Sequence, residues 1–164
     1  MFELILAKIG LVAFILYTSF FFVINGNKTL ESISSTSYIS KEKFGTTLPF
    51  TLICVICSVC LFPLWVAVSP AYYQFLVFIS CLGVMFAGST PFFKQEFEGK
   101  IHYTSGIMAF IGGLTWLLVT SNWPTALAIG LIGGIWTLLD KENYTFIFEF
   151  VGYILICLTV IMMA

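Results

Sequence analysis

The stretch LPFTLICVICSVCLFPLWVAV, residues 48–68, contains no charged side chain. A helix needs about 20 predominantly apolar residues to cross the hydrocarbon core of a bilayer. Pro49 stands near the start of the stretch, where a helix loses no hydrogen bond to proline. Pro63 lies inside it, and membrane helices tolerate such a proline as a kink. The stretch therefore predicts a transmembrane helix.

The rest of the 164-residue chain has the same character. Apolar residues make up 60% of it and aromatic residues 18%, and the mean hydropathy is +1.05. Soluble domains contain about 45–50% apolar residues. A soluble domain of 164 residues has no core large enough to bury the apolar residues beyond this share. The composition predicts an all-α, polytopic membrane protein.

Five further stretches are long and apolar enough to be spans, and the chain reads as a single domain of six transmembrane helices. The predicted spans are residues 2–24, 48–68, 72–92, 101–120, 123–139 and 144–163. Only the loop of residues 25–47, NGNKTLESISSTSYISKEKFGTT, is long and polar. We expect it at the cytoplasmic surface, with a short helix or an extended piece lying on the bilayer. The turn between the fourth and fifth spans is so short that it predicts a tight antiparallel hairpin.

The lysines predict the orientation. The chain has no arginine, and six of its seven lysines lie in the first, third and fifth loops. Loops rich in lysine stay in the cytoplasm. We therefore expect a multi-pass protein of the inner membrane with both termini outside. Aromatic residues near the outer ends of the spans are expected to form an interfacial belt: Trp65, Tyr72, Tyr73, Trp116 and Trp123.

Small residues repeat every four positions on the fourth and fifth spans. The two stripes are Ser105, Ala109 and Gly113, and Ala126, Gly130 and Gly134. Small side chains let helix backbones approach closely in lipid. We expect the stripes to pack against each other within the hairpin; a contact between copies in a homo-oligomer is the alternative.

The most charged window of the chain is FFKQEFEGKIHYTSG, residues 92–106, which carries the single histidine, His102. Ionisable groups inside spans are rare, and each is a functional hypothesis. His102 and Glu149 begin their spans on the same side, Asp140 ends the fifth span there, and Glu98 is close. We predict a polar pocket formed by these four residues. It also includes Tyr103, which neighbours His102. A charge-balanced turn, a packing histidine and a glutamate that locks helices by a hydrogen bond remain the structural alternatives.

The cysteines are read as packing residues. Cys54, Cys57 and Cys60 share the second span, and Cys57, Cys81 and Cys157 fall at similar depth. Three thiols at one depth suit a soft metal or a redox pair. Free cysteine is, however, also a small buried hydrophobe, and we predict no metal site and no cofactor.

Several functions are excluded by composition and motif. One histidine permits neither a bis-histidine haem site nor a three-histidine zinc site. G-x-S-x-G, H-E-x-x-H and P-loop motifs are absent. A net charge of −1 gives no basic field for nucleic acid. The sequence assigns no catalytic residue.

Three segments together resemble a known superfamily: SISSTSYISKEKFG before the second span, GSTPF…KIHYTSGIMAF across the third loop, and FEFVGY in the last span. The layout is similar to that of uncharacterised bacterial multi-span proteins of the CREST superfamily, relatives of alkaline ceramidase. The resemblance implies a bundle with a polar site near one membrane face, lined by His102, Ser89 and Glu149. The known hydrolases of the superfamily hold a metal with several histidines and acids. This chain keeps one histidine.

Three functions remain open. The preferred interpretation is a non-enzymatic accessory, assembly or lipid-binding module, whose partners are the bilayer and either another protein or further copies of itself. The alternatives are a small transporter or channel, and a CREST-like lipid hydrolase with an incomplete metal site.

Overall fold

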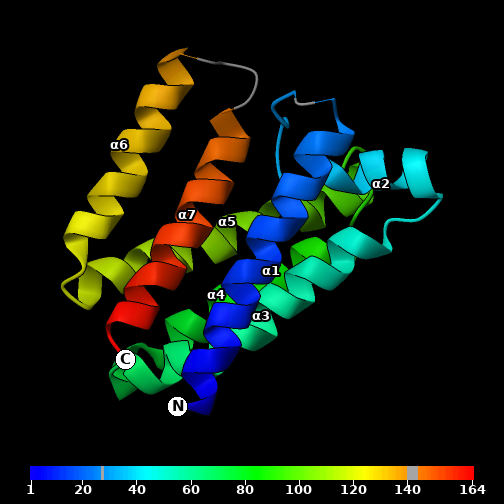
Figure 1. Cartoon of the computed structure of the whole chain (residues 1–164). Helices are drawn as coiled ribbons and strands as arrows, with labels where there is room; N and C mark the ends of the chain where they lie inside the picture. The colour runs from blue at the N-terminus through cyan, green and yellow to red at the C-terminus, as the bar shows by residue number, and fades with distance from the viewer. Residues whose placement is uncertain (27, 140–143) are drawn as a thin grey trace.

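The computed structural model describes residues 1–26, 28–139 and 144–164. It is a helical bundle, which confirms the predicted fold class (Figure 1). The elements are α1 (Phe2–Ile24), α2 (Thr36–Phe44), α3 (Leu48–Val68), the 3-10 helix η1 (Ala71–Tyr73), α4 (Gln74–Ser89), α5 (Glu96–Val119), α6 (Trp123–Leu139) and α7 (Tyr144–Met162).

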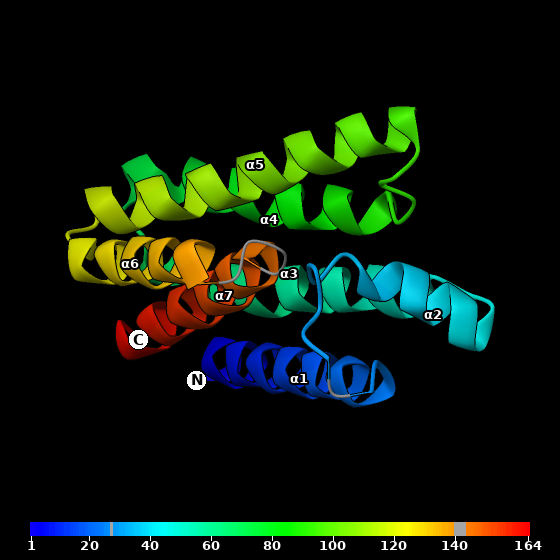
Figure 2. The same cartoon turned by 90° about the horizontal axis from the view of Figure 1, so that it is seen from above.

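Consecutive long helices pack on one another around the bundle. Figure 2 shows α4 and α5 on one side and α1 on the other, with α3 and α7 between them. α7 also contacts α1 and α3, so the last helix closes the bundle against the first. The N- and C-termini lie at the same end of the molecule (Figure 1).

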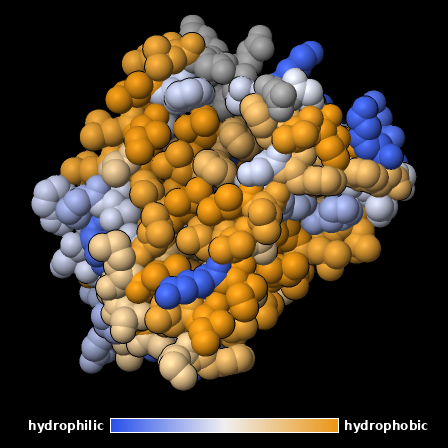
Figure 3. All heavy atoms as spheres, in the orientation of Figure 1, coloured by the Kyte–Doolittle hydropathy of each residue, from blue (hydrophilic) through white to orange (hydrophobic). Residues whose placement is uncertain are grey.

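Among the described residues, five helices are long and apolar enough to cross a membrane: Phe2–Ile24, Leu48–Val68, Ala71–Ser89, Glu96–Val119 and Thr145–Met162. The predicted count was six. The sixth predicted span, α6, is an apolar helix of 17 residues, somewhat shorter than the others. The outer surface agrees with a lipid environment, since large apolar side chains cover most of the face in Figure 3. The chain is a membrane protein.

Two helix ends differ from the prediction by three residues or more. α4 ends at Ser89, three residues early, because Pro91 disfavours a helical conformation in the residue before it, Thr90. α5 begins at Glu96, five residues early. Glu96 and Glu98 lie in its first turn, where carboxylates stabilise the helix dipole. Hydropathy alone does not detect a polar first turn.

The small residues of α5 pack against α4, where the prediction placed them against α6. A Cβ atom added to Gly83 of α4 would lie 2.6 Å from the carbonyl oxygen of Ser105 and 2.7 Å from the backbone nitrogen of Ala109. Gly113 faces α7 instead, since a Cβ there would lie 2.8 Å from Ile156 Cδ1. The predicted hairpin stripe is therefore wrong on the α5 side.

It is also wrong on the α6 side. Added Cβ atoms at Gly130 and Gly134 would meet nothing within 4 Å, whereas one at Gly133 would overlap the ring of Phe148 on α7. Ala126 is half-buried against the main apolar core. α6 carries two glycines one position apart, and spacing alone cannot decide which of them faces the protein.

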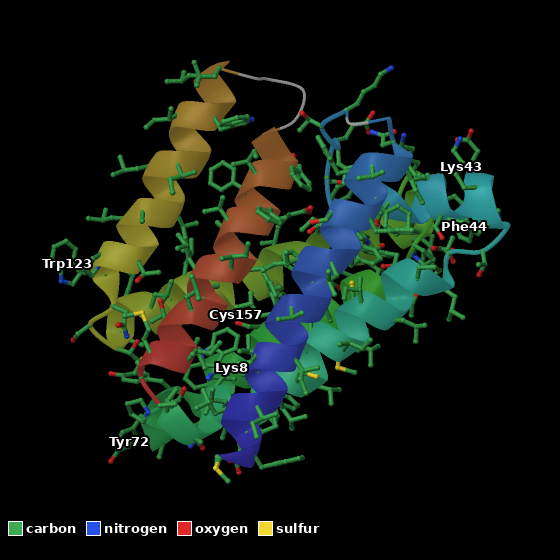
Figure 4. The ribbon with its side chains drawn as sticks, in the orientation of Figure 1. Lys8, Lys43, Phe44, Tyr72, Trp123 and Cys157 are labelled. Atoms are coloured by element: carbon green, nitrogen blue, oxygen red, sulfur yellow. The ribbon has the colours of Figure 1, made fainter. Side chains whose placement is uncertain are left out.

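Two of the predicted belt aromatics lie in the core. Trp65 and Trp116 are 3% and 0% exposed and form an edge-to-face pair with centroids 5.3 Å apart. The indole Nε1 of Trp116 donates a hydrogen bond to the hydroxyl of Ser69 at 2.7 Å. Tyr72 and Trp123, in contrast, project from the surface as an interfacial residue should (Figure 4).

Candidate functional site

The first loop is exposed only in part: residues 30–40 fold into one end of the bundle. We call them the inward-folded segment. Leu30, Thr36, Ser37 and Ser40 are at most 1% exposed. Within the segment, the Thr36 hydroxyl donates to the carbonyl oxygen of Ile33 at 2.6 Å. Small hydroxyl side chains can be buried in this way because their hydrogen bonds are satisfied.

α2 begins within this segment, at Thr36, and is followed by Gly45. That glycine has φ +73° and ψ +5°, the left-handed conformation common after the last helical residue. Its N–H donates to the carbonyl oxygen of Lys41 at 2.9 Å. The predicted short helix in this loop is therefore present, but Thr36, Ser37 and Ser40 at its start are buried where a position on the bilayer surface was expected.

His102 on α5 binds the inward-folded segment. Its Nε2 lies 2.8 Å from the hydroxyl oxygen of Ser34. Its Nδ1 lies 3.0 Å from the carbonyl oxygen of Ala87 and 3.1 Å from that of Thr90. Carbonyl oxygens only accept, so Nδ1 carries the proton of the neutral ring and Nε2 accepts from Ser34. The ring also stacks on Phe93, with centroids 4.9 Å apart.

Glu149 on α7 binds the neighbouring residue. The backbone N–H of Ile33 donates to Glu149 Oε2 at 2.6 Å. His102 and Glu149 thus hold adjacent residues, Ser34 and Ile33, and are connected through the inward-folded segment. This arrangement agrees with a glutamate that locks helices by hydrogen bonding.

Other elements are attached to the same segment or its edges. The Tyr17 hydroxyl of α1 shares a 2.5 Å hydrogen bond with Thr36, and the Ser37 hydroxyl donates to the carbonyl oxygen of Pro91 at 2.8 Å. The backbone N–H of Phe146 in α7 donates to the carbonyl oxygen of Glu31 at 3.2 Å. Side chains and backbone of α1, α5, α7 and the α4–α5 loop therefore meet on one short stretch.

The remaining residues of the predicted pocket lie elsewhere. Glu98 accepts from the backbone N–H of Phe92 at 3.0 Å, next to its own helix start. Ser89 is exposed and donates to the carbonyl oxygen of Phe86. Tyr103 is 59% exposed. Asp140 lies outside the described residues. Of the proposed set, the structure brings His102 and Glu149 to one place.

Lys94, Glu96 and Lys100 lie in the exposed turn that opens α5. Lys100 Nζ is 2.9 Å from Glu96 Oε1, four residues earlier on the helix. Both side chains are largely exposed, and such pairs contribute little to stability. This part of the charged window is a solvated turn, as the structural alternative proposed.

Sequence reasoning missed the partners Ser34, Ile33, Thr36 and Tyr17. One signal was available: between Glu31 and Lys41 no residue is charged, and most side chains carry a hydroxyl group. A loop that needs solvent usually has charges. Ser34 lies 68 residues from His102 in the sequence, and no spacing rule links them.

The cysteines belong to the apolar packing. Cys81 and Cys157 lie in the main core, and Cys54 and Cys57 lie in a second cluster with Phe14 and Phe50. Within the described parts of the chain, no group of three or more histidine, cysteine, aspartate and glutamate side chains is arranged to hold a metal ion.

Comparison with known proteins adds no relative: no protein-family model, curated protein or solved structure matches this chain.

Proposed function

We propose that this chain is a non-enzymatic membrane module that serves as an accessory, assembly or lipid-binding component. One observation carries the proposal. His102, which is buried on α5, and Glu149, which is half-buried on α7, are both bonded to the protein's own inward-folded segment. Their hydrogen-bonding capacity is used to hold the fold, which is what a structural polar cluster requires.

The surroundings of the segment support the same proposal. Its hydroxyl groups bond to backbone carbonyl oxygens, and most of its residues are buried. A transport pathway needs polar groups that face a water-filled space. A bundle end fixed by hydrogen bonds from several helices suits a rigid part that others assemble on.

The test is native mass spectrometry of the protein released from lipid nanodiscs. A bare chain, a homo-oligomer or a chain with retained intact lipid is the expected result. A stoichiometric metal ion would overturn the proposal, because it would require a ligand set that a structural module does not need.

A second candidate function, a lipid hydrolase, rests on the polarity of the Ser34–His102 hydrogen bond. Ser34 donates to Nε2, and two carbonyl oxygens orient the opposite ring nitrogen. In this arrangement a histidine can take the serine proton while the oxygen attacks an ester carbonyl, and can return that proton to the departing alcohol. It can then take a proton from water, which attacks the acyl-serine and releases the acid. Ser34 is 8% exposed, so the inward-folded segment would have to move before an ester could reach it.

A fluorophosphonate probe with peptide mapping separates the two functions. Labelling of Ser34 in the wild type, lost in His102→Ala, would favour the hydrolase and overturn the non-enzymatic module. Ser89→Ala is the matched control, since Ser89 lies near the same end but makes only a local bond. No labelling at Ser34 would remove the hydrolase.

A further inference from the structure

A shallow groove runs along the outward face of α1, away from the inward-folded segment. Its volume is about 450 Å³, and it is lined by Ile5, Lys8, Ile9, Val12, Ala13 and Leu16. We call it the α1 groove. Lys8 lies in it as a charged side chain on an otherwise apolar face (labelled in Figure 4).

The order of charged and apolar residues along α1 matches the order of the charged headgroup and the acyl chains in a phospholipid. Lys8 is six residues after the first helical residue, Phe2, or about 9 Å along the axis. Leu16 is a further eight residues, about 12 Å, toward the middle of the helix. The ammonium group of Lys8 therefore lies nearer the end of the bundle, and apolar side chains follow it toward the middle of α1. A phospholipid has its charge and its acyl chains in the same order.

Among the residues that the structure describes, Lys8 has no ion-pair partner. Ion pairs between described residues involve the N-terminal amine with Glu3, Lys94 with Glu31, and Lys100 with Glu96, and none of them includes Lys8. A lysine on an apolar helix face can extend its stem so that the ammonium group reaches the polar interface. There the available anions are lipid phosphates.

We propose that the α1 groove binds an anionic glycerophospholipid, with its headgroup on Lys8 and an acyl chain over Val12, Ala13 and Leu16. This rests on the lipid-binding part of the proposed function and names the class of lipid. A second copy of the chain is a poorer occupant. In a twofold interface through α1, Lys8 would face Lys8 of the other copy at the same depth, and like charges repel.

The experiment uses nanodiscs of equal parts phosphatidylcholine and phosphatidylglycerol, followed by native mass spectrometry of the lipid retained. We expect wild-type protein to retain phosphatidylglycerol in preference to phosphatidylcholine, and Lys8→Met to reduce that ratio about fivefold, the effect of one basic residue near an anionic surface. Lys8→Arg should keep the preference because it keeps the charge. Lys43→Gln is the control, since Lys43 is an exposed lysine of α2.

Equal retention of both lipids by the wild type, or an unchanged ratio in Lys8→Met, would overturn the inference. So would a lipid-free dimer that Lys8→Met strengthens, because a second copy would then occupy the groove. These failures concern Lys8 alone. The non-enzymatic module would still stand unless a metal ion or a labelled Ser34 were found.

Discussion

At the scale of single residues, the informative feature is that two ionisable groups on different helices bind adjacent residues of one segment. His102 accepts from Ser34, and Glu149 accepts from the backbone of Ile33. Neither contact is a charge pair between the two side chains. Loss of either hydrogen bond loosens the same inward-folded segment. The effects of the two losses on the free energy of unfolding should therefore be coupled through this segment.

A double-mutant cycle tests this coupling. We expect His102→Ala and Glu149→Gln each to lower the Tm in detergent, and the double variant to lose less than the sum. The interaction energy should lie in the range of about 0.5–3 kcal/mol typical of residues in one network. Thermal unfolding of the four proteins, followed by circular dichroism, gives the values. Additive losses would mean that the two side chains stabilise the segment independently.

Ser34 has its own prediction. Ser34→Ala removes the donor from the buried Nε2 of His102 and leaves that acceptor unsatisfied. Such a group costs about 1–3 kcal/mol. The Tm should fall clearly, whereas Ser89→Ala, which changes an exposed hydroxyl, should leave it nearly unchanged. Equal Tm values for the two variants would contradict the role given to Ser34.

At the scale of helices, the close contact of α4 with α5 depends on glycine. A side chain at Gly83 would meet the backbone of Ser105 and Ala109 closer than real Cβ atoms approach, and backbone cannot rotate away as a side chain can. Overfilling a packed interface costs about 1–3 kcal/mol. The α4–α5 interface therefore requires glycine at position 83 of α4, in addition to the small residues on α5.

Gly83→Ala should consequently lower the Tm, and Gly106→Ala on α5 should not. A Cβ at Gly106 meets nothing within 4 Å, and alanine favours a helix over glycine by roughly 0.5–1 kcal/mol. The two variants make the same chemical change on packed helices. A loss of similar size in both would show that the effect comes from glycine itself and not from the α4–α5 contact.

Hydropathy and proline placement were enough to predict most long helices. The start of α3 at Leu48 and the bounds of α1 were predicted as they occur, because long apolar runs mark both helices and Pro49 marks the start of α3. The predicted packing partners of the small-residue stripes were wrong. A four-residue repeat shows that one helix face carries small side chains, but it does not show which neighbouring helix that face contacts. The site was half predicted: His102 and Glu149 stand out as ionisable groups in apolar runs, whereas their partners are common serines and backbone groups.

At the scale of the whole molecule, the two ends of the bundle differ. One end holds the inward-folded segment, α2 and most of the described lysines. The other holds both termini and, along α1, the approach to the α1 groove. A polar end fixed by internal hydrogen bonds and an apolar wall with one exposed cation serve different roles. The first stabilises the fold, and the second is the surface offered to lipid.

This arrangement makes the number of crossings testable. If α6, with its 17 residues, spans the bilayer, the chain crosses six times and both termini lie on the same side; if it does not, five crossings put them on opposite sides. We expect the same side, since the termini share one end of the bundle (Figure 1). The lysine distribution predicts that this side is outside.

Reporter fusions decide both points. Two reporters are used in a bacterial expression host: alkaline phosphatase, which is active only outside the cytoplasmic membrane, and a fluorescent protein that is fluorescent only inside. Each is fused to the N-terminus, to the C-terminus, or within the Ser121–Asn122 turn of the protein. Phosphatase activity at all three positions is expected, because the turn joins α5 to α6 at the end that carries the termini. Fluorescence at the C-terminus with phosphatase activity at the N-terminus would mean five crossings. Fluorescence at all three would keep the six crossings and reverse the orientation, which would place Lys8 and its lipid in the cytoplasmic leaflet.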